Sequence, residues 1–359
     1  MRKICLIIHS IGVGGMERVM RQLAISFSER NDTKIDLILI GRKREIIFSL
    51  PESIKIHRPS FNFDNKKRIR NTLKTILFLR KKVKEINPDR ILSFGEYWNN
   101  LVLLTLYGLA YSIFISDRSE PGKDLGKFQN FLRNKLYPKA RGYIAQTQEA
   151  KRVCLARAWN NNVKVIGNPI RKIDMNNEEK KENIVLSVGR LIKTKHFDQL
   201  IRMFVEIGNT DWKLVIVGGD SKKQNLLVEL NQLVKDMGAC GSVFLEGEQK
   251  NIDAYYNKSS IFAFSSSSEG FPNVIGEALS AGLPVVCYDN IAGPSDMIEN
   301  GVNGFLVPAN DVSQFKRKLS LLMMDEDLRN SMSEQSCKYI KHFNLESISS
   351  EYFTFLFNN

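Results

Sequence analysis

Short apolar runs alternate with longer amphipathic segments along the chain, and this alternation constrains the fold more than any other feature of the sequence. The apolar runs of a first series are residues 3–9, 35–40, 54–56, 90–94, 113–115, 142–145 and 163–166. A second series consists of residues 184–188, 212–217, 243–245, 261–264 and 284–287. Uniformly apolar strands separated by helices are typical of parallel sheets covered by helices on both faces. The sequence therefore predicts an α/β protein with two open parallel sheets.

The length of the chain also favours two domains. At 359 residues it exceeds the size at which one hydrophobic core usually stops growing. A polar, charged stretch at 171–182 separates the two series, and we interpret it as a linker. We predict a Rossmann-like domain at 1–170 and a second at 171–340, with a final helix at about 341–359 that packs back on the first. In such sheets ligands bind beyond the carboxyl ends of the strands, so the two sheets are expected to face a central cleft.

Charge is divided unevenly between the two predicted domains. Residues 1–170 carry 32 of the 52 Lys and Arg residues but only 14 of the 39 Asp and Glu residues. Such a basic half favours contact with a polyanionic surface. Its most basic segment, 66–86, carries apolar residues at helical spacing, namely Ile69, Leu73, Ile76, Leu77 and Val83. Two interpretations stay open: a helix that docks on anionic lipid headgroups, and a crossover helix whose apolar stripe packs on the sheet.

Several other classes of protein are disfavoured. The five cysteines form no Cys-x-x-Cys pair and the four histidines are dispersed, so no metal cluster is predicted. The first apolar run is too short for a signal peptide, and the longest, 101–115, is shorter than the roughly 20 residues that a spanning helix needs. The basic half lacks the interleaved aromatic residues of a nucleic-acid-binding sheet, so no nucleic-acid partner is expected. These observations predict a cytoplasmic protein.

The stretch 265–284 places two carboxylates, Glu269 and Glu277, between two apolar runs. A helix is predicted to begin near Pro272 or Asn273, because proline is tolerated in a first turn but not in a helix interior. The N-terminus of this helix would present free N–H groups that favour an anion. Both acids would then face a ligand that lies across the helix start. The alternative is an acid in a surface loop followed by an ordinary exposed acid on a helix.

Basic residues and a glycine-rich loop extend this candidate site. Arg190 directly follows the run at 184–188, and Lys195 lies at the start of the next predicted helix. The planar fork of an arginine and the point charge of a lysine suit a diphosphate group, although the same pair also occurs as solvated surface. Glycines within 12–15, between the first strand and its helix, let the backbone approach a phosphate or a sugar closely.

Together these segments resemble glycosyltransferase family 4, a retaining family with the GT-B fold of two Rossmann-like domains. The similarity is greatest to members that build bacterial surface polysaccharides such as O-antigen and capsule. The matching motifs are Gly-Gly-Met-Glu-Arg at 14–18, Gly-Asn-Pro at 167–169, Ser-Val-Gly-Arg-Leu at 187–191, Val-Gly-Gly-Asp at 217–220, the stretch 267–278, Gly-Leu-Pro-Val-Val at 282–286, Gly-Pro at 293–294 and Asn-Gly-Phe-Leu-Val at 303–307. The resemblance covers nearly the whole chain and implies an enzyme.

The resemblance implies a role for each matching residue. Glu277 would hold the ribose hydroxyls of the donor nucleotide. Arg190 and Lys195 would neutralise the diphosphate and the charge that grows on it as the sugar leaves. Glu269 would lie beside the sugar ring, and Gly15 would approach the donor from the other domain. The backbone segment that would contact sugar hydroxyls and phosphate consists of Gly270, Phe271, Pro272, Asn273 and Val274. Such a scheme needs neither a metal nor a cofactor, and the nucleotide sugar is a substrate.

One motif departs from the family pattern. Many members carry a histidine after the corresponding strand of the first domain, whereas this chain reads Ser-Asp-Arg-Ser-Glu-Pro at 116–121. Three alternatives stay open for the residue that meets the acceptor: Arg118 in place of the histidine, Asp117, or Glu120.

From the resemblance and the basic first domain we expect a hexosyltransferase. It would transfer a hexose or N-acetylhexosamine, with retention, from a nucleotide-diphosphate sugar, most simply a UDP-sugar, to a lipid-linked saccharide. The protein would associate peripherally with the anionic inner face of a bacterial plasma membrane. The alternative is a catalytically inactive subunit of the same fold that binds the membrane and a partner glycosyltransferase.

Overall fold

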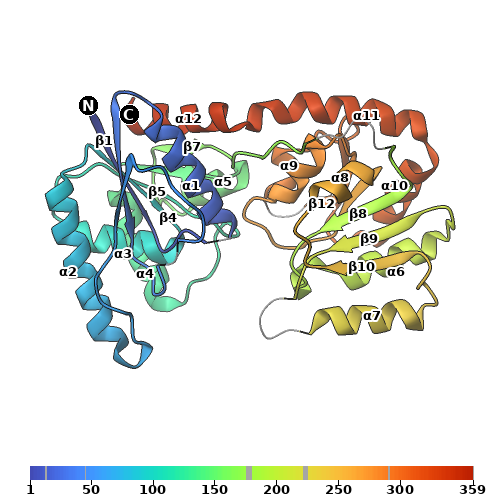
Figure 1. Ribbon diagram of the computed structural model, residues 1–359, viewed down its shortest axis with the longest axis horizontal. Helices are drawn as coiled ribbons and strands as arrows, with labels where there is room; N and C mark the ends of the chain where they lie inside the picture. The colour runs from blue at the N-terminus through green and yellow to red at the C-terminus, as the bar shows by residue number, and fades with distance from the viewer. Residues whose placement is uncertain (13, 45, 175–179, 221–224, 290–291, 359) are drawn as a thin grey trace. The chain divides into compact units, whose positions relative to one another are not determined.

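The protein consists of two compact units, and each is described by itself (Figure 1). The first contains residues 1–169 and 345–359, and the second contains residues 170–344. The structure is a computed structural model that describes residues 1–12, 14–44, 46–174, 180–220, 225–289 and 292–358. Residues 175–179 of the predicted linker therefore lie outside the described residues. Residues 171–174 belong to the second unit, where Ile173 is fully buried.

The first unit contains a seven-stranded parallel sheet in the order β3-β2-β1-β4-β5-β6-β7. Its strands are β1 (Arg2–Ile8), β2 (Thr33–Leu39), β3 (Ile54–His57), β4 (Arg90–Phe94), β5 (Ile113–Ser116), β6 (Gly142–Ala145) and β7 (Val163–Val165). The strand order reverses between β1 and β4. Loops leave such a switch point in opposite directions, which opens a crevice at the carboxyl ends of the two strands.

Six helices accompany this sheet in the described residues, together with 3₁₀ turns at 65–67 and 137–139. They are α1 (Gly15–Ser28), α2 (Arg68–Ile86), α3 (Glu96–Leu106), α4 (Lys127–Leu136), α5 (Gln148–Ala156) and α12 (Leu345–Phe357). Helix α12 comes from the far end of the sequence yet lies beside α1 (Figure 1). The Phe353 and Phe27 rings meet edge to face at 5.8 Å, and Ser26 Oγ donates a hydrogen bond to Ser349 Oγ.

The second unit contains a six-stranded parallel sheet in the order β10-β9-β8-β11-β12-β13. Its strands are β8 (Ile184–Val188), β9 (Lys213–Val217), β10 (Val243–Gly247), β11 (Ile261–Phe264), β12 (Val285–Asp289) and β13 (Gly304–Pro308). Its helices are α6 (Phe197–Ile207), α7 (Leu226–Asp236), α8 (Asp253–Lys258), α9 (Asn273–Ser280), α10 (Val312–Met324) and α11 (Glu326–Tyr339), with 3₁₀ turns at 193–195, 294–296 and 340–343. The switch point of this sheet lies between β8 and β11.

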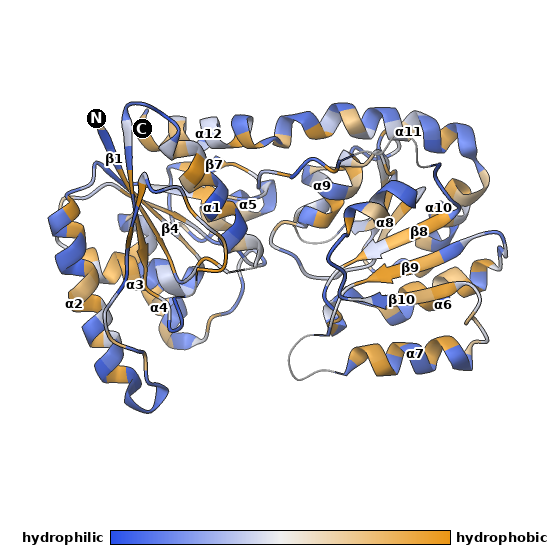
Figure 2. Cartoon of the chain, viewed as in Figure 1, coloured by the Kyte–Doolittle hydropathy of each residue, from blue (hydrophilic) through white to orange (hydrophobic). Residues whose placement is uncertain are grey.

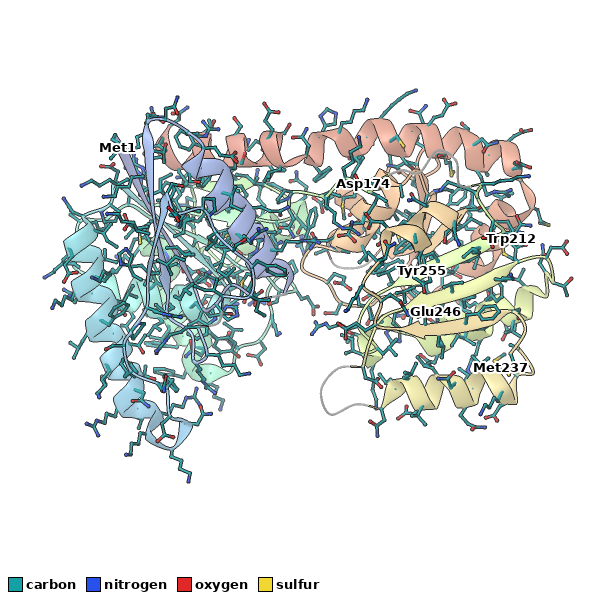
Figure 3. The ribbon with its side chains drawn as sticks, in the orientation of Figure 1. Met1, Asp174, Trp212, Met237, Glu246 and Tyr255 are labelled. Carbon is teal, nitrogen blue, oxygen red and sulfur yellow. The ribbon has the colours of Figure 1, made fainter. Side chains whose placement is uncertain are left out.

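Buried side chains cover both faces of the second sheet. One face packs Phe204, Trp212 and Phe315 together, and the other packs Phe262, Ile275 and Leu279. Figure 3 shows Glu246 of β10 and Tyr255 of α8 at the end of this sheet, where Tyr255 Oη donates a hydrogen bond to Glu246 Oε2. The prediction of an α/β protein with two parallel sheets is confirmed.

Helix α2 packs with a different face from the apolar stripe that the sequence predicts. The stripe residues Ile69, Leu73 and Leu77 are 80%, 56% and 69% exposed. The buried residues are Asn71, Thr75, Leu79 and Val83. The two polar ones can be buried because Asn71 Nδ2 donates to the Asp64 carbonyl and Thr75 Oγ1 to the Asn71 carbonyl. The interpretation in which the stripe packs on the sheet is therefore wrong for Ile69, Leu73 and Leu77, whereas Ile76 is half-buried and Val83 is buried. Figure 2 shows the hydrophobic bands on the otherwise hydrophilic helix.

Among the described residues, no helix combines the length and the apolar character that a membrane crossing requires.

Candidate active site

Lys195 and Glu269 form an ion pair at the switch point of the second sheet. Lys195 ends the 3₁₀ turn that follows β8, and Glu269 lies in the loop that follows β11. Lys195 Nζ lies 2.6 Å from Glu269 Oε1, both side chains are largely buried, and the ammonium lies 4.8 Å from the centroid of the Phe264 ring. Ser266 Oγ donates a second hydrogen bond to the same carboxylate oxygen, at 2.7 Å. A lysine and a glutamate 74 residues apart are therefore one chemical unit.

The two loops that carry this pair are joined by further hydrogen bonds. Ser265 Oγ donates to the Lys195 carbonyl at 2.7 Å, and the Ser267 N–H donates to the Thr194 carbonyl at 2.8 Å. His196 Nε2 and Ser267 Oγ share a hydrogen bond of 2.8 Å. Because the serines after β11 bind the backbone after β8, they hold Lys195 and Glu269 in register.

Arg190 projects from the same edge of the sheet. The strand β8 ends at Val188, and the backbone beyond it is anchored because the Leu191 N–H donates to the Gly219 carbonyl at 2.9 Å. Gly218 permits this close approach, since a Cβ there would lie 1.8 Å from the Gly189 carbonyl oxygen. The Arg190 side chain is exposed and makes no hydrogen bond or ion pair with other described residues. It can therefore turn toward an anionic ligand without losing a partner.

Helix α9 begins at Asn273, as the sequence predicts. Pro272 is its N-cap residue and packs against Gly293, where a Cβ would lie 2.3 Å from Pro272 Cδ. Phe271 is buried, with its ring 6.0 Å from that of Phe343. These contacts define the course of the backbone through Gly270 and Val274. The predicted contacts of this segment with sugar and phosphate stay a prediction.

Glu277 is buried on α9 and held from two directions. Arg171 Nε lies 3.3 Å from Glu277 Oε1, and Tyr256 Oη donates a hydrogen bond to Glu277 Oε2 at 3.2 Å. Arg171 also pairs with Asp253 through Nη1 at 2.5 Å. A carboxylate has about four acceptor positions, which is the chemistry that neighbouring hydroxyl groups require. Its supports, Arg171 and Tyr256, carry no signal in the sequence, since they lie 106 and 21 positions away.

The first unit gathers polar residues where β1, β4 and β5 end. His9 follows β1, Glu96 follows β4 and Asp117 follows β5. Glu96 Oε1 accepts hydrogen bonds from the Ser119 N–H at 2.9 Å and from Ser119 Oγ at 2.6 Å, which positions the loop after β5. Gly15, the predicted donor contact of this unit, is the exposed first residue of α1.

His9 pairs with Glu17 of the Gly-Gly-Met-Glu-Arg motif. The distance from His9 Nε2 to Glu17 Oε1 is 3.0 Å, and the imidazole stacks on Trp98 with ring centroids 5.7 Å apart. Partial burial acts to raise the pKa of Glu17, but hydrogen bonds from His9 and from its own N–H outweigh burial, so the pKa lies below its ordinary value. Glu17 is therefore ionised and pairs with His9 Nε2.

The pKa of Asp117 is raised, whereas that of Glu17 is lowered. Burial, and then the nearby charge of Glu96, raise its pKa from 3.8 to about 7, although hydrogen bonds from Tyr137 and Asn99 act against this rise. Tyr137 Oη donates to Asp117 Oδ1 at 2.6 Å and Asn99 Nδ2 at 3.0 Å. A carboxyl group with a pKa near neutrality is suited to accept a proton and release it again.

Arg118 is held by the first unit itself. Its Nη2 donates to Asn168 Oδ1 at 2.5 Å, its Nη1 donates to Tyr352 Oη at 3.2 Å, and its guanidinium lies 4.2 Å from the centroid of the Phe94 ring. These contacts tie β5 to α12 and to the Gly-Asn-Pro motif. Which of Asp117, Arg118 and Glu120 meets the acceptor stays a prediction.

The chain is similar to known glycosyltransferases. Residues 170–339 match the family described as "Glycosyl transferases group 1". The chain is also 29% identical to an uncharacterized glycosyltransferase of Haemophilus influenzae over 366 residues, which cover 98% of this chain and 99% of the relative. These similarities indicate a glycosyltransferase.

A second relative and a solved structure extend the comparison. This glycosyltransferase is 27% identical to the Campylobacter jejuni protein named "GalNAc-alpha-(1->4)-GalNAc-alpha-(1->3)-diNAcBac-PP-undecaprenol alpha-1,4-N-acetyl-D-galactosaminyltransferase", over 98% of this chain and 97% of the relative. The structure of Anabaena HepE in complex with UDP matches it with a TM-score of 0.81 at 17% identity and covers 100% of both chains. The predicted GT-B fold and enzymatic class are thus confirmed.

The residues predicted for the site fall into two groups in this glycosyltransferase. Lys195 and Glu269 are joined directly, and Arg190 and Glu277 lie in the same unit as this pair. Gly15, Asp117 and Arg118 lie in the other unit. Sequence reasoning missed the supports of these groups, since a partner such as Tyr137 or Arg171 becomes visible only when the chain has folded.

Proposed function

We propose that the protein transfers a hexose or N-acetylhexosamine from a UDP-sugar to a lipid-linked saccharide, with retention of the anomeric configuration. The observation that supports a nucleotide-sugar donor is the Lys195–Glu269 pair, which lies at a sheet switch point beside the exposed Arg190. In open α/β sheets this is where nucleotides bind. The acceptor half is supported by the Campylobacter jejuni relative, whose name specifies an undecaprenol-linked saccharide.

In this proposal the donor lies at the carboxyl ends of β8 and β11. Arg190 and Lys195 stabilise the diphosphate as negative charge develops on it, which is the main electrostatic requirement of the reaction. Glu269 keeps the Lys195 ammonium in place and accepts hydrogen bonds from the sugar. Glu277 accepts hydrogen bonds from the two ribose hydroxyls. The two cations supply the positive charge, so the scheme requires no divalent metal.

Donor class is testable by thermal unfolding in the presence of UDP-, GDP-, ADP- and CMP-linked sugars. A ligand at 100 times its Kd stabilises the folded state by about 2.7 kcal/mol, so the correct base gives a clear shift in Tm. We expect the UDP-sugars to give the largest shift and Glu277→Gln to remove most of it, while Glu206→Gln, an exposed acid of α6, leaves it unchanged. A full shift in Glu277→Gln would show that Glu277 does not hold the ribose.

Retention is tested on the product of the reaction. If the proposal holds, NMR of the transferred sugar shows the same anomeric configuration as in the donor. An inverted product contradicts this part of the proposal and leaves the donor assignment intact.

We further propose that α2 rests on the anionic inner face of the membrane that holds the acceptor. The exposed Ile69, Leu73 and Leu77 lie along one side of the helix, and the exposed Lys66, Lys74 and Lys84 lie near them. An apolar stripe with basic flanks is the pattern of a helix that lies in a membrane interface. Lys81 and Lys82 contribute less, because both pair with Glu85.

Replacing Leu73 by glutamate is expected to lower the affinity for anionic vesicles by about tenfold or more, since one buried leucine contributes about 1.5–3 kcal/mol. Cosedimentation with phosphatidylglycerol vesicles at low salt measures this affinity. Val228→Glu is the matched control, because Val228 is an apolar residue on α7 of the second unit that is 68% exposed, more than Leu73. Equal binding by wild type and Leu73→Glu would show that α2 does not contact the membrane surface.

A further inference from the structure

The first unit contains a cavity of about 920 Å³ that neither the fold nor the donor site requires. It is lined by the start of α2, by α3 and α4, and by the backbone after β2. His9 and Ser10, which follow β1, also line it, so the cavity reaches the carboxyl edge of the sheet. Ligand pockets commonly have volumes of about 300–1,000 Å³.

The walls of this cavity divide into an apolar part and a basic part. The apolar part is formed by Phe63, Trp98, Leu101, Leu104, Phe128 and Leu132. Three residues of the lining are also prominent on the surface: Tyr97 is 51% exposed, Leu104 is 45% exposed and Phe128 is 69% exposed. The apolar lining thus continues out of the cavity onto α3 and α4. The basic part consists of Arg42, Lys43, Arg44 and Arg68.

Arg44 is the least expected member of this lining. It is only 5% exposed and adopts a left-handed backbone conformation, with φ of 55°. Its Nε donates to the Gly41 carbonyl and its Nη1 to the Phe61 carbonyl, but its buried Nη2 has no hydrogen-bond partner among the described residues. Among the residues that the structure describes, no acidic residue lines the cavity to compensate the charge. A buried guanidinium with a free donor is costly unless something else accepts from it.

Two other buried polar atoms of the lining lack partners. Asn100 Nδ2 donates to Gln129, but Asn100 Oδ1 accepts from no described residue. The same holds for His9 Nδ1, on the side of the ring away from Glu17. The cavity therefore offers an unused donor beside a cluster of cations, and unused acceptors on α3 and directly after β1. An anion would satisfy the first and hydroxyl groups the second.

From these features we infer that the cavity binds the diphosphate of an isoprenoid-diphosphate carrier, together with the isoprene units next to it. This inference rests on the proposed function and names where its lipid-linked acceptor is held. The diphosphate lies against Arg42, Arg44 and Arg68, and the isoprene units lie against the apolar walls and the exposed Tyr97 and Phe128. The saccharide then extends toward His9 at the end of β1.

The chemistry of the lining excludes simpler occupants. A free inorganic anion would leave the aromatic and aliphatic walls unused, whereas an uncharged lipid would leave Arg44 Nη2 unpaired in an apolar environment. An amphipathic ligand with a polyanionic group at one end satisfies both parts at once. Four cations in the lining match the charge of a diphosphate ester better than that of a single phosphate.

Binding of farnesyl diphosphate to the full chain, without vesicles, tests the inference. The chain has three tryptophans, of which Trp159 and Trp212 are buried, so quenching of Trp98 reports on the cavity. We expect saturable quenching by farnesyl diphosphate and binding at least about tenfold weaker for farnesol and for inorganic diphosphate. Trp98→Phe abolishes the signal if the ligand binds where we infer.

Charge reversal at Arg68 provides the matched comparison. Arg68→Glu is expected to weaken farnesyl diphosphate binding by about tenfold or more, because one charge-assisted contact is replaced by repulsion. The variant keeps its fold, since an acidic residue in the first turn of a helix is favourable. Arg70→Glu makes the same change two residues further along α2 but does not line the cavity, and it is expected to bind within about twofold of wild type.

Every other outcome overturns the inference. Equal weakening by Arg68→Glu and Arg70→Glu indicates only general electrostatic attraction. Farnesol that binds as tightly as farnesyl diphosphate indicates a plain apolar surface, and inorganic diphosphate that binds as tightly indicates an anion site without a lipid. The shift in Tm with nucleotide sugars tests the proposed function separately. If a nucleotide sugar binds but farnesyl diphosphate does not, only the assignment of the cavity is refuted.

Discussion

Lys195→Ala is expected to lower kcat/KM for sugar transfer by about 10²–10³-fold, with most of the loss in kcat. The ammonium lies against Glu269 at 2.6 Å in a largely buried position, where charges act more strongly than in water. As the sugar leaves, the diphosphate acquires charge that this cation stabilises more in the transition state than in the ground state. Steady-state transfer to a lipid-linked acceptor, with thermal unfolding to verify the fold, measures the effect.

Two further variants serve as controls for this prediction. Lys193→Ala removes an exposed lysine from the same 3₁₀ turn and is expected to retain normal transfer. Glu269→Gln keeps an acceptor for Lys195 but removes its counter-charge, so a smaller loss than in Lys195→Ala is expected. Normal turnover by Lys195→Ala would refute the role of Lys195 in leaving-group stabilisation and with it the donor scheme.

Asp117→Asn is expected to change both the pH dependence of stability and the rate of transfer. The pKa of Asp117 is about 7 in the folded protein, whereas its ordinary value is 3.8. Between these two pH values the carboxyl group is therefore protonated in the folded protein and ionised in the unfolded chain. Stability of the wild type therefore falls as pH rises from about 4 to about 7, by up to about 4 kcal/mol for a shift of this size. Asparagine cannot ionise, so Asp117→Asn avoids this loss and is more stable than wild type at pH 8 but not at pH 4.

Urea unfolding at several pH values measures this difference in the free energy of unfolding. Glu52→Gln, which removes an exposed acid of the same unit, is expected to leave the pH profile of stability unchanged. If Asp117 also accepts the acceptor proton, kcat/KM of the wild type rises with pH through about 7, and Asp117→Asn is slower by about 10²–10⁴-fold with a flat profile. A variant that is no more stable than wild type at pH 8 would contradict the raised pKa.

Much of the fold was predictable because local patterns determine it. Strand runs such as 184–188 and 261–264 are uniformly apolar, and Pro272 marks the start of α9. The partners of the site residues were not predictable, because they depend on which loops meet at a sheet edge. Lys195 and Glu269 are 74 positions apart, and only the adjacency of β8 and β11 brings them into contact.

Helix α2 shows a different limit of sequence reasoning. Periodicity identifies Ile69, Leu73 and Leu77 as one apolar stripe, but it does not show whether that stripe packs against the rest of the protein or is exposed. The polar Asn71 and Thr75 are buried because their side chains bond to nearby carbonyls, which no hydrophobicity pattern records. The unpaired Arg44 Nη2 was equally hidden, since its burial depends on the backbone around Gly41 and Phe61.

The return of α12 to the first unit has a consequence for the order in which the protein folds during synthesis. Phe353 packs on Phe27 and Phe355 packs on Phe114, so the core of the first unit includes residues that are made after all of residues 170–344. The second unit is continuous in sequence and can fold as soon as it emerges from the ribosome. The unit that is translated first is therefore completed last, and until then the surface that α12 covers is open to chaperones.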